Sequence, residues 1–227
     1  MKDTKSYLSK IVQDMPDSGI KDFFDVANTM EGALSLGVGE PDFPTPEHVR
    51  EAAIASIKKG DTKYTDNRGT VELRAAAADY LTKFDLHYDK QDEILITMGA
   101  SEGIDLALRT LVNPGEEVLV AEPSYVSYIP CIELCGGVPV SLKLRAENKF
   151  RLTREQLEEK ITEKSKVLLI SYPNNPTGAI MEKEDLEAIA EVVKEHDLFV
   201  ITDEIYAELT YGKKHVSIAS LPGMYER

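Results

Sequence analysis

Several residues with polar or aromatic side chains directly follow apolar runs, at the points where buried strands would end. In "LISYPNNPTGAI", residues 169–180, Asn175 stands in a cluster of Asn, Pro and Gly. In "ITDEIY", Asp203 ends an apolar run and Tyr206 follows about one helical turn later. In "EPSYVSY", Tyr125 follows a third run. These side chains supply an amide, a carboxylate, a phenol and a flat ring, which together could bind a polar aromatic ligand.

A small-residue turn, "GASEG", follows the apolar run 93–98 and opens a predicted helix. The backbone amides of Gly99, Ala100 and Ser101, with the helix dipole, form a site suited to a phosphate. Each feature also has a common structural explanation when it is taken alone. The Asn-Pro cluster can be only a turn, Ser101 and Asp203 can cap helices, and Tyr125 can pack in the core.

Helical and strand patterns alternate from about residue 46, which indicates a three-layer αβα domain with a mainly parallel sheet. Predicted strands cover 93–98, 116–121, 138–144, 166–171 and 198–202, and predicted helices between them cover 101–112, 124–135, 153–162 and 183–196. Four of these strands are apolar along most of their length, as in a sheet covered on both faces.

Two further helices are predicted before the first strand. The first, in "TPEHVREAAIASIKKG", has Thr45 as N-cap and Gly60 as terminator, and the second lies in "TVELRAAAADYLTKF". Residues 1–45, with an amphipathic helix over 18–30, do not fit the alternation and indicate an arm or part of a second domain.

Ligands of open parallel sheets bind beyond the carboxyl ends of the strands, so the residues named above should share one edge. That set matches pyridoxal 5′-phosphate. Its phosphate would bind at the helix start and its ring would stack on Tyr125. Asn175 and Tyr206 would bond the phenolic oxygen, and Asp203 would pair with the ring nitrogen. A carboxylate about 4 Å from a pyridinium contributes about 4 kcal/mol at an effective dielectric of 20, which raises the ring pKa by about three units.

Six motifs in order make the sequence similar to a known family. "LGVGEPDFPTPEHV", "KYTDNRGTVELR", "MGASEGIDLAL", "EPSYVSY", "YPNNPTG" and "ITDEIYAELTY" resemble the class I/II aminotransferases of fold type I, close to the aspartate/aromatic branch. The resemblance runs from about residue 34 to the C-terminus. It implies a pyridoxal-phosphate-dependent enzyme that moves an amino group between an L-amino acid and a 2-oxo acid.

The resemblance also implies roles for individual residues. Gly39 and Asn175 would lie at the substrate, with Gly39 near its carboxylate. Tyr64 would reach the cofactor phosphate of the neighbouring subunit in a homodimer. Cis peptide bonds are expected at Glu122–Pro123 and Asn175–Pro176. The domains implied are an N-terminal arm with part of the small domain over 1–45, and the pyridoxal-phosphate-binding large domain over 46–227.

The family pattern is incomplete in the printed sequence. The lysine that binds the cofactor covalently, and the arginines that bind its phosphate and the substrate carboxylate, are expected beyond Arg227, so no catalytic residue is assigned here. Lys213 and Lys214 stand in "YGKKH", which reads as a polar turn. The family's sheet has seven strands, and the two not identified here would lie between the strand ending at Thr202 and 93–98. We therefore expect an N-terminal part that is inactive by itself and forms neither the complete active site nor the family's complete sheet.

Two alternatives stay open on the sequence alone. A pyridoxal-phosphate-dependent carbon–sulfur lyase could use the same scaffold, because the residues that separate the two reactions mostly lie beyond Arg227. A truncated, non-catalytic partner chain is the alternative from a different class.

The composition excludes other classes of partner. The 227 residues include 26 Lys and Arg against 40 Asp and Glu, a net charge of −14, which repels nucleic acid and anionic membranes. The first residues contain no apolar core of signal-peptide length, and no apolar run reaches membrane length. Cys131 and Cys135 are expected as reduced thiols with no metal. A cytoplasmic protein is the expectation.

Overall fold

The computed structural model describes residues 4–16, 26, 29–30, 32, 39 and 43–227. The chain divides into two compact units, one of residues 16–67 and one of residues 1–15 with 68–227. The expected domain boundary near residue 45 stays a prediction. Most of the helix expected over 18–30 lies outside the described residues.

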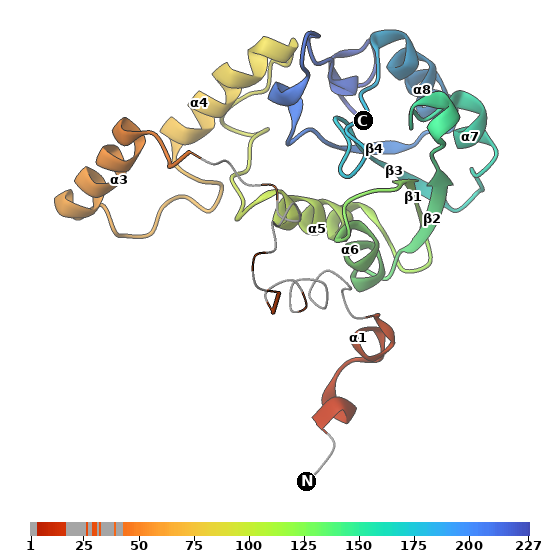
Figure 1. Ribbon diagram of the computed structural model, residues 1–227, viewed down its shortest axis with the longest axis horizontal. Helices are drawn as coiled ribbons and strands as arrows, with labels where there is room; N and C mark the ends of the chain where they lie inside the picture. The colour runs from red at the N-terminus through yellow and green to blue at the C-terminus, as the bar shows by residue number, and fades with distance from the viewer. Residues whose placement is uncertain (1–3, 17–25, 27–28, 31, 33–38, 40–42) are drawn as a thin grey trace. The chain divides into compact units, whose positions relative to one another are not determined.

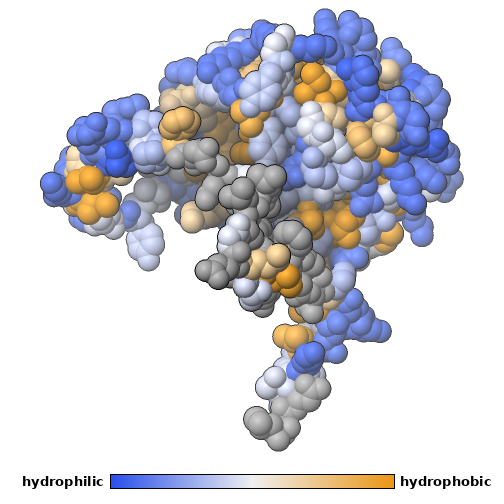
Figure 2. Space-filling view, viewed as in Figure 1, coloured by the Kyte–Doolittle hydropathy of each residue, from blue (hydrophilic) through white to orange (hydrophobic). Residues whose placement is uncertain are grey.

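In the smaller unit the main described element is the helix α3, Glu47–Lys59. The predicted terminator is confirmed, because Gly60 caps the helix in the left-handed conformation with φ 85°. The prediction of Thr45 as the N-cap is wrong. Pro46 stands at the cap without a side-chain bond, because its fixed ring already sets the backbone for entry to the helix. Apolar side chains on α3, including Ile57, are exposed, and Figure 2 shows hydrophobic surface over this helix.

The larger unit contains the sheet and the remaining helices whose bounds the structure describes. In chain order its elements are η1 Thr4–Tyr7, α1 Lys10–Asp14, α4 Val71–Leu81, η2 Thr82–Phe84, α5 Ala100–Leu111, β1 Glu117–Glu122, α6 Tyr128–Leu134, β2 Val138–Lys143, η3 Ala146–Asn148, α7 Arg154–Glu158, β3 Ser165–Ser171, α8 Lys183–Glu195, β4 Phe199–Asp203, η4 Ala207–Leu209 and η5 Ile218–Ser220. Four predicted strands and the helices between them are confirmed, with α6 and α7 shorter than predicted. Thr153 caps α7 in a reciprocal bond pair with Gln156. Among the described helices, none is long and apolar enough to cross a bilayer.

The sheet is parallel, with strand order β2-β1-β3-β4. Successive side chains on a strand face opposite sides, and the core is divided accordingly. Leu119 and Leu168 pack in one hydrophobic cluster with Ile189 of α8. Val118 and Val167 pack in another cluster that includes residues of α5 and α6. The helices α7 and α8 therefore cover one face and α5 and α6 the other, which confirms the three-layer αβα arrangement (Figure 1).

The predicted strand at 93–98 is wrong. In the described part of the chain this segment pairs with no strand of the sheet. The Ile96 amide donates instead to the Arg68 carbonyl oxygen at 3.0 Å, and Leu95 and Met98 are 46% and 90% exposed. A strand exists through its ladder of backbone bonds, and an apolar pattern cannot show whether a neighbour supplies that ladder.

Two contacts nevertheless fix the path of this segment toward α5. The guanidinium of Arg74, only 1% exposed, donates to the carbonyl oxygens of Gly69, Lys90 and Gln91. Gly69 has φ 95°, and a Cβ on it would lie 2.5 Å from Cγ1 of Ile96. Only glycine therefore fits where the chain before α4 crosses the segment that leads to Gly99.

We expect Gly69→Ala to lower the free energy of unfolding by about 2–4 kcal/mol, the sum of left-handed strain and overpacking against Ile96. Gly115→Ala is the matched control, because Gly115 has φ 87° with nothing within 4 Å of the added Cβ. It should cost about 1–2 kcal/mol, the strain alone. Urea unfolding of the two variants tests this, and equal losses would contradict the close contact.

Candidate functional site

A cavity of about 300 Å³ lies at the carboxyl edge of the sheet, beyond the ends of β3 and β4. Its lining contains Met98, Gly99, Ala100, Ser101, Tyr125, Tyr128, Ser171, Asn175, Asp203, Ile205 and Tyr206. The structure thus brings together seven residues named from the sequence: Gly99, Ala100, Ser101, Tyr125, Asn175, Asp203 and Tyr206. Gly39 and Tyr64 belong to the 16–67 unit, and their proximity to the pocket stays a prediction.

The turn after β3 presents Asn175 to the pocket through the residue before it. Asn174 is 4% exposed. Its side-chain oxygen accepts from the amide and hydroxyl of Thr177, at 3.2 and 2.8 Å, and its side-chain nitrogen donates to the Pro123 carbonyl oxygen at 3.2 Å. Asn174 therefore shapes its own turn and joins it to the loop after β1. The cis bonds expected at Glu122–Pro123 and Asn175–Pro176 are confirmed, and Tyr172–Pro173 is also cis.

Asp203, the last residue of β4, is held at both carboxylate oxygens. The Tyr128 hydroxyl donates to Oδ2 at 2.7 Å, and the Ile205 amide donates to Oδ1 at 3.1 Å. Tyr128 is 1% exposed. Its burial, together with the Asp203 carboxylate, raises the pKa of the Tyr128 hydroxyl well above its ordinary value. The phenol therefore keeps its proton at neutral pH and orients the carboxylate.

Tyr125 is partly exposed and is held by contact with a neighbouring aromatic ring. Its side chain is 38% exposed, and its ring meets the Tyr128 ring edge-on, with centroids 5.8 Å apart. An aromatic pair of this geometry stabilises both rings while leaving a face open. Tyr206 lies at the start of η4, where its carbonyl oxygen accepts from the Leu209 amide at 2.8 Å.

The start of α5 forms the far side of the pocket. Gly99 is the N-cap, with φ 84°, a conformation that other residues rarely adopt. A Cβ on Gly99 would meet nothing within 4 Å, so the space in front of the helix is open. The carboxylate of Glu102 already accepts from the Met98 amide, so an anionic group is bound at this helix start. The Gly99 amide donates to the Thr97 carbonyl oxygen at 2.9 Å. The amides of the first turn from Ala100 on have no acceptor within the helix and can bind a second anion.

This donor set fits pyridoxal phosphate. The group needs an anion site, a flat apolar contact, polar partners for its phenolic oxygen and a carboxylate for its ring nitrogen. The pocket contains each of these groups, and its volume is in the range of small-molecule sites. The chemistry of these lining groups favours an organic phosphate.

Four lining residues were not predicted from the sequence: Met98, Tyr128, Ser171 and Ile205. Tyr128 could have been found, because it follows Tyr125 by three residues and so shares its side of a helical turn. No pattern in the sequence indicates that its hydroxyl reaches Asp203, which is 75 positions away in the chain.

Comparisons with known proteins agree with this geometry. The family described as "Aminotransferase class I and II" matches residues 31–226. An aromatic-amino-acid aminotransferase of Thermococcus litoralis is 45% identical, over 97% of this chain and 57% of its own length.

Two solved structures share the fold. A Pyrococcus protein designated A1 has a TM-score of 0.92 and 43% identity, over 95% of this chain and 56% of its own length. A single mutant of Thermus thermophilus aspartate aminotransferase has a TM-score of 0.89 and 37% identity, over 95% of this chain and 57% of its own length. This chain thus spans little more than half the length of these relatives, and its fold is that of the fold type I aminotransferases. It belongs to the family of class I and II aminotransferases.

Proposed function

We propose that this chain provides the pyridoxal-phosphate-binding part of an aminotransferase that moves an amino group between an L-amino acid and a 2-oxo acid. The observation that carries the proposal is the position of Asp203 in the same pocket as the start of α5 and Tyr125. A carboxylate, a helix N-terminus and an exposed aromatic face are the three features that a phosphorylated pyridine requires.

Each residue has a binding or orienting role in this proposal. The amides of Ala100 and Ser101 hold the phosphate, and Gly99, whose own amide donates to Thr97, leaves the space in front of them open. The Tyr125 ring packs on the pyridine. Asn175 and Tyr206 bind the phenolic oxygen. When bound, the cofactor draws electrons from the substrate Cα into its protonated ring. Asp203, oriented by Tyr128, keeps that ring protonated, and Asn175 with Gly39 contacts the substrate.

None of the residues described as lining the pocket is a lysine. We therefore assign to this chain the noncovalent part of the cofactor site. The names of the relatives support amino-group transfer over carbon–sulfur lysis, and they include aspartate and aromatic-amino-acid aminotransferases.

The assembly and location also belong to this proposal. The side chain of Tyr64 is fully exposed, as suits a residue that completes the site of a second subunit in a homodimer. The net charge of −14 disfavours binding to nucleic acid and to anionic membranes. We propose a cytoplasmic homodimer that takes part in amino acid metabolism.

In the full protein, Asp203→Ala should nearly abolish transamination and Asp203→Glu should keep part of it, because the ring loses or weakens its charge partner. Asp203→Asn should weaken binding of pyridoxine 5′-phosphate, an analogue without the aldehyde, at least tenfold by calorimetry; a close ion pair contributes up to about 4 kcal/mol.

The matched control is Asp105→Asn. Asp105 pairs with Arg109 on α5 at 2.8 Å and does not line the pocket. The Asp105→Asn variant should bind pyridoxine 5′-phosphate with the affinity of the parent chain. Near-normal turnover by Asp203→Ala would refute the role of the carboxylate.

The two neighbouring asparagines should separate binding from stability. Asn175→Ala should weaken pyridoxine 5′-phosphate binding about tenfold, the loss of about one hydrogen bond, with an unchanged urea midpoint. Asn174→Ala should lower the free energy of unfolding by about 1–3 kcal/mol, because it removes buried bonds to Thr177 and Pro123. Calorimetry and urea unfolding on both variants check this pattern. The reverse result, a loss of stability in Asn175→Ala and a loss of affinity in Asn174→Ala, would show that these roles are wrong.

A further inference from the structure

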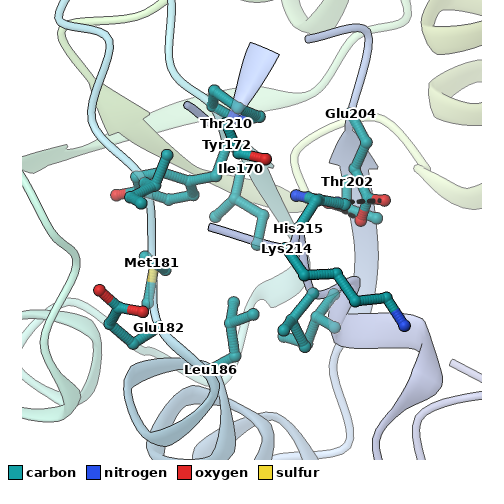
Figure 3. Close-up of a pocket in the computed structure, with 14 residues that line it drawn as sticks. Ile170, Tyr172, Met181, Glu182, Leu186, Thr202, Glu204, Thr210, Lys214 and His215 are labelled. Atoms are coloured by element: carbon teal, nitrogen blue, oxygen red, sulfur yellow. Dashed lines mark hydrogen bonds and ion pairs between the residues drawn. The ribbon is translucent and has the colours of Figure 1, made fainter. Parts of the chain in front are cut away.

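A second, much smaller cavity lies beside the end of β4, among side chains that include Thr202, Glu204 and His215 (Figure 3). Its volume is about 20 Å³, room for about one water molecule and too little for a substrate. Glu204 directly follows Asp203, and neighbouring residues of an extended chain point to opposite sides. Asp203 lines the large pocket and Glu204 lines the small one.

The Glu204 carboxylate is bound by three side chains. Oε1 accepts from the hydroxyls of Thr202 at 3.0 Å and Ser217 at 2.8 Å. Oε2 lies 2.9 Å from Nε2 of His215, as Figure 3 shows by the dashed line. The side chains of His215 and Glu204 are only 7% and 18% exposed. Bonds to a charged group that is largely shielded from water are among the stronger ones in a protein.

The His215 ring also packs against an aromatic side chain. Its ring meets the Phe84 ring edge-on, with centroids 5.4 Å apart. Phe84 is buried in a cluster with Leu86 and Ala207. The residues after β4 are therefore attached to α4 and η2 by packing and to the strand end by the Glu204 bonds.

We propose that Glu204, His215 and Ser217 are positioning residues, which hold the end of β4 so that the Asp203 carboxylate meets the cofactor ring at the right distance. The inference rests on the proposed function. Glu204 is bonded directly to Asp203 and Ile205 in the chain. A shift of the Glu204 backbone therefore moves Asp203 and also the Ile205 amide, which donates to the Asp203 carboxylate. Misplacement of a binding group by about 1 Å can cost a hundredfold in rate.

The test is a double-mutant cycle on binding of pyridoxine 5′-phosphate, measured by calorimetry on the full chain. His215→Leu removes one partner of Glu204 and should weaken binding at least fivefold. In the Asp203→Asn background the same substitution should change affinity less than twofold, because the group it positions has lost its charge. His215→Gln restores an N–H donor and should bind within twofold of the parent chain.

Glu182→Gln is the matched control. Glu182 lines the same small cavity and pairs with Lys213 and Arg151, outside the Glu204 contacts. It should leave affinity unchanged even if the urea midpoint falls. If His215→Leu does not fold, Ser217→Ala takes its place in the cycle.

The outcomes separate the two claims. Loss of affinity by the same factor in both backgrounds would show a merely structural role and overturn the inference, as would parent-like binding by His215→Leu. Absence of binding by the parent chain itself would refute the proposed function, and this inference with it.

Discussion

Parallel pairing between β3 and β4 is the constraint on which the site depends. The register sets Ser171 opposite Asp203, so both strands end at the same level. The turn after β3 carries Asn175 and the segment after β4 carries Tyr206, and both arrive at one edge because parallel strands share a direction. The strands pair through backbone hydrogen bonds, and the hydrophobic clusters on both faces of the sheet stabilise this pairing. The pocket is a consequence of how this sheet ends.

Around that edge, the residues proposed to bind the cofactor are held by neighbours to which no binding role is assigned. Asp203 is oriented by Tyr128, and Asn175 is presented by a turn that Asn174 closes. Glu204 lies on the other side of the strand end and is bonded to residues that follow in the chain. This arrangement is what preorganisation of a binding site requires, because groups already held in place need little reordering when a ligand binds.

Much of this could be predicted from the sequence, for a physical reason. Strand ends are visible as the point where an apolar run stops, so Asn175, Asp203 and Tyr125 could be assigned to one edge before any coordinates. The apolar pattern of 93–98 does not by itself reveal whether a neighbour is present. The family resemblance, however, placed two unidentified strands beside it, and in the described part of the chain 93–98 pairs with no strand. The hydrogen bond from Tyr128 to Asp203 and the contacts of Glu204 with its three partners were also not predicted, because the sequence pattern does not show which side chains the fold brings together.

The central claim is that this pocket binds pyridoxal 5′-phosphate with its ring nitrogen on Asp203. A crystal structure of the protein grown with the cofactor tests it most directly. We expect the phosphate beside Gly99 at the amides of Ala100 and Ser101, the ring against Tyr125, and the ring nitrogen about 2.7–3.2 Å from an Asp203 oxygen. A cofactor bound elsewhere, or bound in this pocket with its ring nitrogen away from Asp203, would contradict the account.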